Sequence, residues 1–279
     1  MNFMENGIIL FFPNKVILFR NKYIEEWRTA HPWSNPQVEQ DLIISRAIVE
    51  IFSDGFLRKS LVFRGGTALH KVYITPPARY SEDIDLVQIT SEPINPVLKR
   101  IRENLSFLGM KRIVKQRNHN NTMIYRFDTE IQPVVNTRLK IEINTREHLN
   151  IFGVQEIPYK VENGWFSGEC NVTGFAVEEL LGSKLKALYG RKKGRDLFDL
   201  FWAITHLDID VEKLLFCNTK QYENADQKPP TNKQFLRNMD EKLNDIEFTN
   251  DIFSVLKPDI EYEHAIAWEK VRIALKINE

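Results

Sequence analysis

A pair of glycines between an apolar run and a helical pattern constrains this chain more than any other local feature. The pattern predicts a strand over Leu61–Phe63, a turn at Gly65 and Gly66, and a helix over Thr67–Tyr73. Glycines at the start of a helix let an anion approach the free backbone N–H groups, which the helix dipole makes favourable. The turn therefore predicts a phosphate site to which the Thr67 hydroxyl can also donate.

Two aspartates follow the glycine turn on a second predicted strand. Asp83 and Asp85 are two residues apart, so both carboxylates leave the same face of the strand. Such a pair is most often a solvated strand face or a turn. Sixteen residues separate Gly66 from Asp83, however, and beside the glycine turn the pair favours a site for a metal and a nucleotide, because Mg²⁺ (or Mn²⁺) is held by a few carboxylates together with substrate phosphates and water.

A third carboxylate is available on a later predicted strand, Arg138–Asn144. Glu142 lies on its polar face together with Lys140, and Ile141 lies on the apolar face. One interpretation makes Glu142 a further metal ligand. The other makes it an exposed glutamate paired with Lys140 or Arg146, and the sequence leaves both open.

Lys184 lies in the middle of an apolar helical stripe. Leu181, Leu185 and Leu188 mark that stripe, and a lysine within it must reach an anion or extend to solvent. Lys184 is therefore expected to bind the nucleotide and to act in catalysis. Lys186 falls near the opposite edge of the helix and is expected to face solvent or RNA.

A basic loop and two aspartates follow this helix. The loop Arg191–Arg195 suits a polyanion if it lies beside a phosphate site, and it is otherwise ordinary surface. Asp196 and Asp199 are three residues apart and share one helical face, so both are candidates for the site. Asp196 is the catalytic candidate, and the candidate supporting residues are Asp199, Arg195, Arg79 and Ser81. The alternatives are a helix cap at Asp196 and a salt bridge from Asp199 to Arg195.

The net charge is zero, but the charges are segregated. Lys99–Arg117 contains seven basic residues and one acidic residue, whereas Asn238–Glu263 contains eight acidic and two basic residues. The basic stretch and the loop Arg191–Arg195 could form one track for a polyanion. Alternatively, one of them docks on the acidic segment of the same chain.

Several other classes of protein are excluded by what the sequence lacks. Two cysteines without metal spacing argue against a disulfide framework or a zinc site. The apolar runs Ile8–Phe12 and Val16–Phe19 are interrupted by polar residues, so neither a secretory signal nor a membrane helix is expected. Serine hydrolase, Walker A and dinucleotide motifs are absent. The expectation is a cytoplasmic protein that does not associate with membranes.

The overall pattern predicts an α+β fold. A helix begins after Pro36 with Asn35 as its cap, another covers about Val97–Leu108, and further strands are expected at Thr122–Phe127 and Arg138–Asn144. Residues 1–170 should form a mixed sheet flanked by helices, and residues 171–279 a helical domain that completes the site. The helices expected there are Val177–Tyr189, Asp196–Thr205, Val211–Phe216, Asn232–Leu243 and Tyr262–Ile277.

Four motifs in this order resemble the AbiEii/AbiGii toxin family, nucleotidyltransferase-like proteins of toxin–antitoxin and abortive-infection systems. They are Phe63–Tyr73 around the glycine turn, Arg79–Leu86 with the two aspartates, Glu178–Lys184, and Arg191 with Arg195–Leu200. The resemblance implies a nucleotidyltransferase-like core, with the glycine–hydroxyl turn, the aspartate pair, the lysine and the late aspartate falling on Gly66 and Thr67, Asp83 and Asp85, Lys184, and Asp196.

The resemblance also implies a reaction and partners. A nucleoside triphosphate (NTP) held with Mg²⁺ would donate a nucleotide to an acceptor, with RNA and particularly tRNA as one acceptor class, and a cognate antitoxin would neutralise the toxin. A metal-dependent nuclease is the first alternative, but it usually has a lysine two residues after the strand acid, where this chain has Asn144. A non-catalytic module that binds RNA or protein is the second, and the intact pair Asp83 and Asp85 argues against it.

Overall fold

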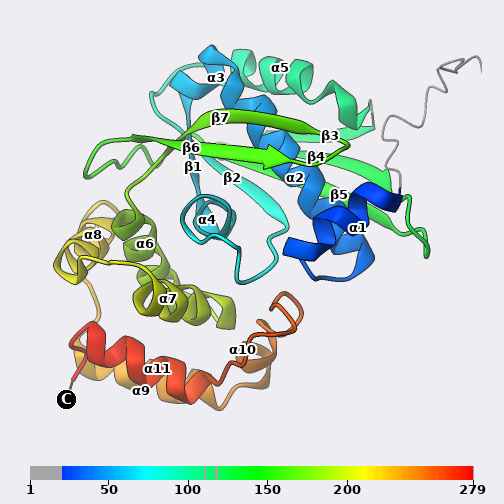
Figure 1. Cartoon of the computed structure of the whole chain (residues 1–279). Helices are drawn as coiled ribbons and strands as arrows, with labels where there is room; N and C mark the ends of the chain where they lie inside the picture. The colour runs from blue at the N-terminus through cyan, green and yellow to red at the C-terminus, as the bar shows by residue number, and fades with distance from the viewer. Residues whose placement is uncertain (1–20, 110, 117–118, 279) are drawn as a thin grey trace, which may run out of the picture.

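A seven-stranded sheet with helices on both sides dominates the computed structural model, which describes residues 21–109, 111–116 and 119–278. In Figure 1, α3 and α5 lie above the strands and α6 to α11 lie below them, while α2 runs alongside the strands. The N-terminal runs Ile8–Phe12 and Val16–Phe19 lie outside the described residues.

The helices alternate with strands in the first part of the chain and follow one another in the last part. They are α1 (Asn21–Ala30), α2 (Asn35–Ser53), α3 (Gly55–Ser60), α4 (Gly65–Ala68), α5 (Asn95–Asn104), α6 (Val177–Gly190), α7 (Gly194–His206), α8 (Val211–Glu223), α9 (Asn232–Leu243), α10 (Ile246–Asn250) and α11 (His264–Ala274). A π-helical turn, Leu69–Tyr73, continues α4, and a 3₁₀ turn, Ser106–Leu108, follows α5.

The sheet is mixed, with the strand order β3-β4-β5-β2-β1-β7-β6. Its strands are β1 (Leu61–Arg64), β2 (Asp83–Gln88), β3 (Arg112–Gln116), β4 (Asn120–Asp128), β5 (Asn136–Asn144), β6 (Gln155–Glu162) and β7 (Ser167–Gly174). β2 pairs with β5 and β1 with β7 in parallel, and the other neighbours are antiparallel. The parallel pairing of β2 with β5 brings residues that are far apart in sequence side by side, such as Asp85 and Glu142.

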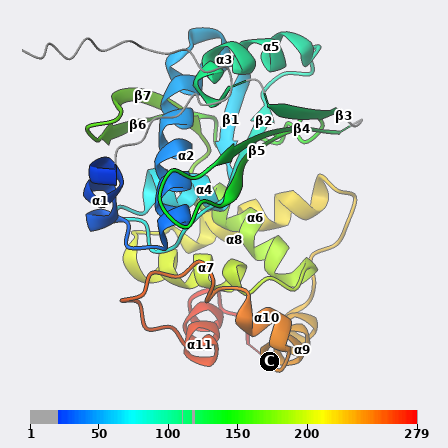
Figure 2. The same ribbon diagram turned by 90° about the vertical axis from the view of Figure 1, so that its right-hand side faces the viewer.

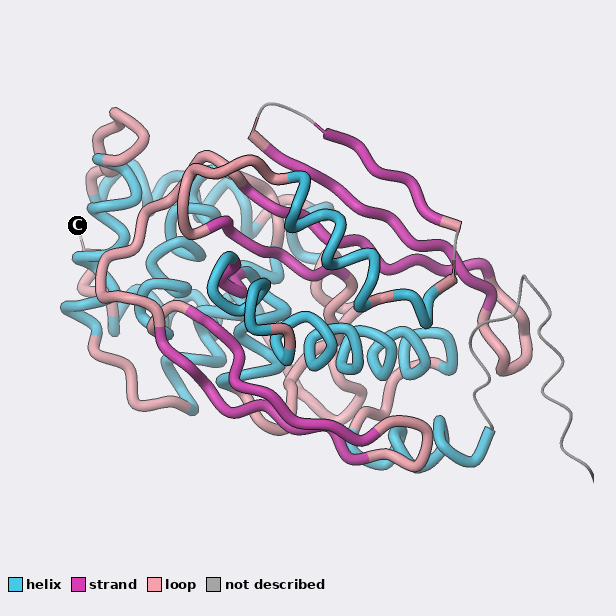
Figure 3. Tube along the Cα trace, turned by 90° about the horizontal axis from the view of Figure 1, so that it is seen from above, coloured by secondary structure: helices cyan, strands magenta, loops and turns pink. Residues whose placement is uncertain are grey.

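Helix α2 covers the middle of the sheet, with strands visible on either side of it when the molecule is seen from above (Figure 3). Ser34, not Asn35, is its N-cap, and the Ser34 backbone N–H donates to Gln37 Oε1 at 3.2 Å. Ile44 and Ile48 of α2 share one core with Ile84 and Ile141 of the sheet, all four fully buried. Burial of this apolar face leaves the polar residues of β2 and β5 on the opposite face.

The predicted fold class is confirmed, and the differences concern particular elements. The structure confirms the helix over Asn232–Leu243, and it ends the expected helix Val97–Leu108 early, at Asn104. α1, α3, α10 and the strands β3, β6 and β7 were not expected from the pattern. The sheet continues past the predicted boundary at residue 170, because β7 ends at Gly174, and the division into two domains remains a prediction.

Helices α6 to α11 form a group next to the lower side of the sheet, as Figure 2 also shows. α6 packs against α7 and α8, and α7 packs against α11. None of the described helices is both long and apolar enough to cross a membrane. The group places the basic residues of α6 and α7 opposite the polar face of β2.

Candidate active site

The glycine turn brings a carboxylate and a guanidinium group against the backbone. Gly65 has φ +82°, a conformation that L side chains rarely adopt, and a Cβ there would overlap the Asp85 carboxylate. A Cβ on Gly66 would overlap the guanidinium of Arg79. Gly65 therefore requires glycine for backbone conformation and space, whereas a side chain at Gly66 would displace the Arg79 guanidinium.

Thr67 makes a contact inside the protein that the sequence does not predict. Its side chain is 4% exposed, and its hydroxyl donates to the backbone carbonyl of Asp83. The hydroxyl thus ties the first turn of α4 to the first residue of β2. The backbone N–H groups of Gly66 and Thr67 lie in the first turn of the helix, where N–H groups have no intrahelical partner.

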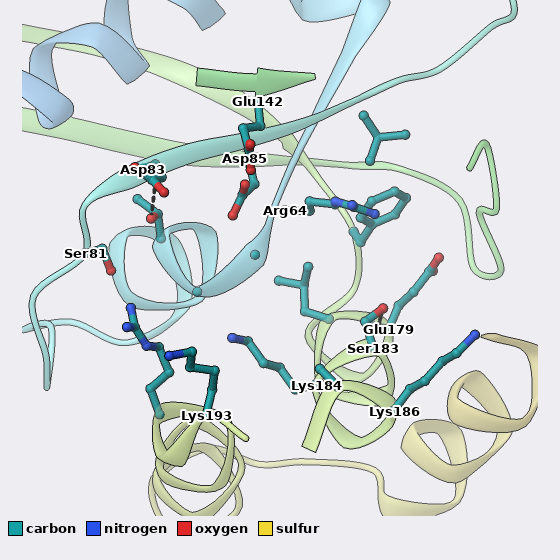
Figure 4. Close-up of a pocket in the computed structure, with 18 of the residues that line it drawn as sticks. Arg64, Ser81, Asp83, Asp85, Glu142, Glu179, Ser183, Lys184, Lys186 and Lys193 are labelled. Atoms are coloured by element: carbon teal, nitrogen blue, oxygen red, sulfur yellow. Dashed lines mark hydrogen bonds between the residues drawn. The ribbon is translucent and has the colours of Figure 1, made fainter. Parts of the chain in front are cut away.

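Three carboxylates lie on one face of the sheet. Strand alternation puts Asp83 and Asp85 on that face, and the parallel register pairs Asp85 with Glu142. Figure 4 shows these side chains along one wall of the cavity. Burial raises the pKa of Asp85, and the negative charges of Asp83 and Glu142 raise it further.

Lys140 provides the positive charge among these carboxylates. The register places it opposite Asp83, and its Nζ lies 2.7 Å from Asp83 Oδ2 and 3.5 Å from Glu142 Oε2. Partial burial alone would lower the pKa of Lys140, but Asp83 outweighs that effect and the pKa is raised. The predicted pairing of Glu142 with Lys140 is present, and it shares the same ammonium group with Asp83.

Lys184 projects from α6 toward the strand carboxylates and forms ion pairs with two aspartates of α7. Its Nζ lies 3.1 Å from Asp196 Oδ1 and 2.8 Å from Asp199 Oδ2, and both aspartates are completely buried. Burial alone would lower the pKa of Lys184, but Asp199 and Asp196 reverse that effect and raise it. Lys184 is therefore a fixed positive charge, as the helical stripe predicted, with carboxylates as its partners inside the chain.

Asp199 joins three basic side chains from distant parts of the sequence. Arg79 donates to it through Nε at 2.6 Å and Nη2 at 2.8 Å, and His70 Nε2 lies 2.9 Å from Oδ1. Burial opposes ionisation of Asp199, but Arg79 and Lys184 hold its pKa well below the usual range. Burial and the charge of Arg79 lower the pKa of His70 to about 4. The predicted alternative, a salt bridge from Asp199 to Arg195, is not formed.

Asp196 is the second buried carboxylate that holds basic side chains of the cavity in place. Arg191 donates to it through Nε at 2.7 Å and Nη2 at 2.9 Å, so the carboxylate holds Arg191 as well as Lys184. The N-cap of α7 is Lys193, which rules out the capping alternative for Asp196. With no exposed surface, Asp196 lies behind the cavity wall instead of in it.

The basic loop after α6 docks on the acidic segment of the same chain. Arg195 donates to Asp251 at 2.9 and 3.0 Å, and Lys192 donates to Asp245 at 2.6 Å. Lys193 Nζ lies 3.4 Å from Asp251 Oδ1. This confirms the docking alternative for Arg191–Arg195. In Figure 1, α5, which begins the basic stretch Lys99–Arg117, lies on the far side of the sheet from α7, so the two do not form one track.

These groups surround a cavity of about 660 Å³. Of the residues singled out in the sequence, it is lined by Gly65, Gly66, Thr67, Arg79, Ser81, Asp83, Asp85, Glu142, Lys184 and Arg195. Asp196 and Asp199 lie behind it. The lining also includes Arg191 and Lys193 of the basic loop, Lys140 and Lys186, and two residues for which no local pattern indicated a place in the site, Arg64 and Glu179. Lys186 is not simply solvated, since it donates to the Gln221 carbonyl at 2.6 Å.

The donor set suits a divalent ion that arrives with a nucleotide. Among the described residues, no three His, Cys, Asp or Glu side chains are arranged as a complete metal site. Two carboxylates nevertheless suffice for Mg²⁺ or Mn²⁺ when substrate phosphates and water supply the other ligands. Burial, together with Asp83 and Glu142, raises the pKa of Asp85, so a cation beside this carboxylate would favour its ionised form.

Two solved structures share this fold across nearly the whole chain. The nucleotidyltransferase toxin MenT4 from Mycobacterium tuberculosis aligns with a TM-score of 0.65 and 15% identity, covering 93% of this chain and 89% of MenT4. A protein from H. pylori provisionally described as a nucleotidyltransferase aligns with a TM-score of 0.52 and 21% identity, covering 88% and 95% of the two chains. No curated protein sequence matches the chain.

A family model provides the classification that these distant structures do not. The model for the nucleotidyl transferase AbiEii toxin of type IV toxin–antitoxin systems matches residues 46–275. The match contains the glycine turn, the three strand carboxylates, and the α6 and α7 residues that anchor Lys184. The chain therefore belongs to the AbiEii family of nucleotidyltransferase toxins.

Proposed function

We propose that this toxin transfers a nucleotide from an NTP to a hydroxyl group of RNA, with tRNA as the acceptor class. The observation that carries the proposal is the division of charge across the cavity. Carboxylates of β2 and β5 form one wall, and basic side chains of α6 and the following loop form the other (Figure 4). A metal-bound triphosphate has the complementary charges for both walls.

The glycine turn and Lys184 would bind the phosphates. The backbone N–H groups of Gly66 and Thr67 lie in the first turn of α4 and would donate to the phosphate oxygens, and Gly65 lets the Asp85 carboxylate lie directly beside this turn. Lys184 would neutralise charge that develops on the phosphates as the acceptor oxygen bonds to the α-phosphorus and pyrophosphate leaves. Because its ammonium is held by two carboxylates, it needs little rearrangement to do so.

Asp83 and Asp85 would hold a divalent ion, with Glu142 as a further ligand. When bound with the nucleotide, that ion would polarise the α-phosphate and stabilise the leaving pyrophosphate. Asp196 and Asp199 have no exposed surface and are assigned a positioning role, because they hold Lys184, Arg191 and Arg79 in place. Arg79 lies against Gly66 and donates to the Ser81 hydroxyl at 3.4 Å, so these two residues would support the glycine turn through Arg79.

The family supports two further parts of the proposal. A type IV toxin–antitoxin system implies a cognate antitoxin that counteracts the toxin, and its reaction on RNA suits a cytoplasmic location. A metal-dependent nuclease remains the rival activity for grouped carboxylates, and a non-catalytic binding module is the other rival. Neither rival needs both a nucleotide-sized cavity and an anchored lysine opposite the carboxylates.

Incubation with each labelled NTP, Mg²⁺ and total RNA separates these activities. Label on RNA supports the proposal, shortened RNA supports a nuclease, and neither result supports a binding module. Asp83→Ala and Asp85→Ala should abolish labelling and growth inhibition while the fold persists, because each removes a ligand and also relieves repulsion. Glu169→Ala, which removes an exposed strand carboxylate outside the cavity, should leave labelling unchanged.

A further inference from the structure

A second cavity adjoins the candidate active site at Asp83. Its volume is about 330 Å³, and it shares Glu82 and Asp83 with the larger cavity. Two neighbouring strands supply arginines to its wall, Arg126 from β4 and Arg138 from β5. A linear ligand lying across both cavities would therefore pass from these arginines to the carboxylates.

The two arginines lie directly opposite each other. The antiparallel register of β4 and β5 pairs Arg126 with Arg138, and both side chains are exposed. Like charges that face each other across two strands destabilise the pair. An arrangement of this kind gains stability when an anion binds between the two guanidinium groups.

Neither guanidinium group has a partner among the residues that the structure describes. The acidic residue two positions after Arg126 is Asp128, and it accepts from Asn136 Nδ2 at 2.8 Å. The basic residues of the larger cavity differ, because Lys184, Arg191 and Arg195 are each paired with a carboxylate inside the chain. Arg126 and Arg138 are thus available to an external ligand.

Strand alternation places the arginine pair on the same face as the three carboxylates. Leu139 and Ile141 are fully buried on the opposite face, so Arg138, Lys140 and Glu142 share the open one. Arg138 and Glu142 are four residues apart, which is about 13 Å along a strand. This distance suits a polymer that reaches the carboxylates with one end and the arginines with an inner segment.

The strand order separates the arginine pair from the side that would hold the donor nucleotide. β2, with Asp83 and Asp85, has β1 and the glycine turn on one side and β5 on the other. Gly66 of the proposed phosphate-binding turn follows β1 directly in the chain. Arg138 on β5 and Arg126 on β4 lie on the other side of β2, so the ligand that they bind is the acceptor and not the triphosphate.

We propose that Arg126 and Arg138 bind the phosphodiester backbone of the acceptor RNA and direct its reactive hydroxyl toward Asp83 and Asp85. Guanidinium groups bind phosphate oxygens in a bidentate manner, and such contacts position a nucleic acid without reading its sequence. The inference rests on the proposed function and adds the path of the acceptor. It assigns the acceptor to the β4–β5 side of the carboxylates.

The test compares Arg126→Ala/Arg138→Ala with Lys228→Ala/Lys233→Ala, a control that also removes two exposed positive charges. Binding of bulk tRNA is measured across a salt series, and NTP binding is measured separately. Two lost phosphate contacts should make the slope of log affinity against log salt shallower by about 1.4. A fourfold rise in salt should therefore weaken tRNA binding by the arginine variant about sevenfold less than it weakens binding by the wild type. The control should keep the wild-type slope, and both variants should keep wild-type NTP affinity and thermal stability.

Three other results would each overturn a specific part of the reasoning. An unchanged slope in an arginine variant that labels RNA normally would overturn the acceptor path alone. Weaker NTP binding in that variant would show that the arginines hold the donor phosphates. A wild-type protein that binds NTP but labels no RNA would overturn the proposed function itself.

Discussion

Asp199→Asn should destabilise the fold far more than Asp85→Asn, although the two aspartates contribute to one site. Asp199 is completely buried and pairs with Arg79, Lys184 and His70 within 2.6–2.9 Å. The amide keeps one acceptor oxygen but no charge, so Arg79 and Lys184 lose an ionic partner, and the other acceptors of Arg79 are the Tyr80 carbonyl at 2.9 Å and the Ser81 hydroxyl at 3.4 Å. Loss of one partner from a buried ion pair costs about 3–5 kcal/mol, which corresponds to a fall in Tm on the order of 10 °C.

Asp85→Asn is the matched control, because it makes the same chemical change where the charge is unfavourable. Burial, with Asp83 and Glu142, raises the pKa of Asp85, so removing its charge should leave stability unchanged or slightly higher. Urea and thermal unfolding give the stability of each variant, and NTP labelling of RNA gives activity, which both should lose. Wild-type stability of Asp199→Asn, or an equal loss in both variants, would refute the distinction between anchoring and ligand carboxylates.

Three further predictions concern other charged residues. Lys184→Met should reduce transfer far more than Lys186→Met, because only Lys184 is fixed by two buried carboxylates opposite the strand acids; equal losses measured by labelling would contradict this. Lys140→Met should increase the affinity for Mn²⁺ in the absence of nucleotide, because the ammonium that neutralises Asp83 and Glu142 is gone. Titration calorimetry measures this affinity, and an unchanged value would show that Lys140 does not compete with the ion. Glu39→Gln should stabilise the fold above pH 7 but not below pH 4.5. Burial raises the folded-state pKa of Glu39 from 4.5 to about 7. Its contribution to the free energy of unfolding is therefore fully present below pH 4.5 and falls by about 3 kcal/mol as pH rises through 7, which denaturant unfolding measures. A difference between variant and wild type that does not change with pH would contradict the assignment.

Local periodicity was enough to predict the parts of the site that lie within one element. Alternation along β2 predicted that Asp83 and Asp85 share a face, and the helical stripe predicted that Lys184 points inward. The glycine turn was predicted because Gly65 and Gly66 interrupt an apolar run directly before a helix. In each case, the spacing within a few residues determines the geometry.

The remaining features depend on contacts that local spacing does not encode. The pairing of Arg79 with Asp199 joins residues 120 positions apart, and the pairing of Lys140 with Asp83 depends on the register of two parallel strands. The hairpin β6–β7 was missed although Ile157, Tyr159 and Val161 alternate with less buried residues, because Pro158 and Gly168 are residues that strands disfavour. The Thr67 hydroxyl was expected to face a phosphate, but its partner is the backbone of Asp83.

The docking of Arg195 on Asp251 has a consequence for protein synthesis. A ribosome makes the strand carboxylates first, then Lys184 and its aspartate anchors, and reaches Asp251 only near the end of the chain. A product that stops before Asp245 would keep the carboxylates and Lys184, but Lys192, Lys193 and Arg195 would lose their acidic partners Asp245 and Asp251. Nonsense mutations between codons 207 and 245 should therefore disturb this side of the cavity while leaving the sheet intact.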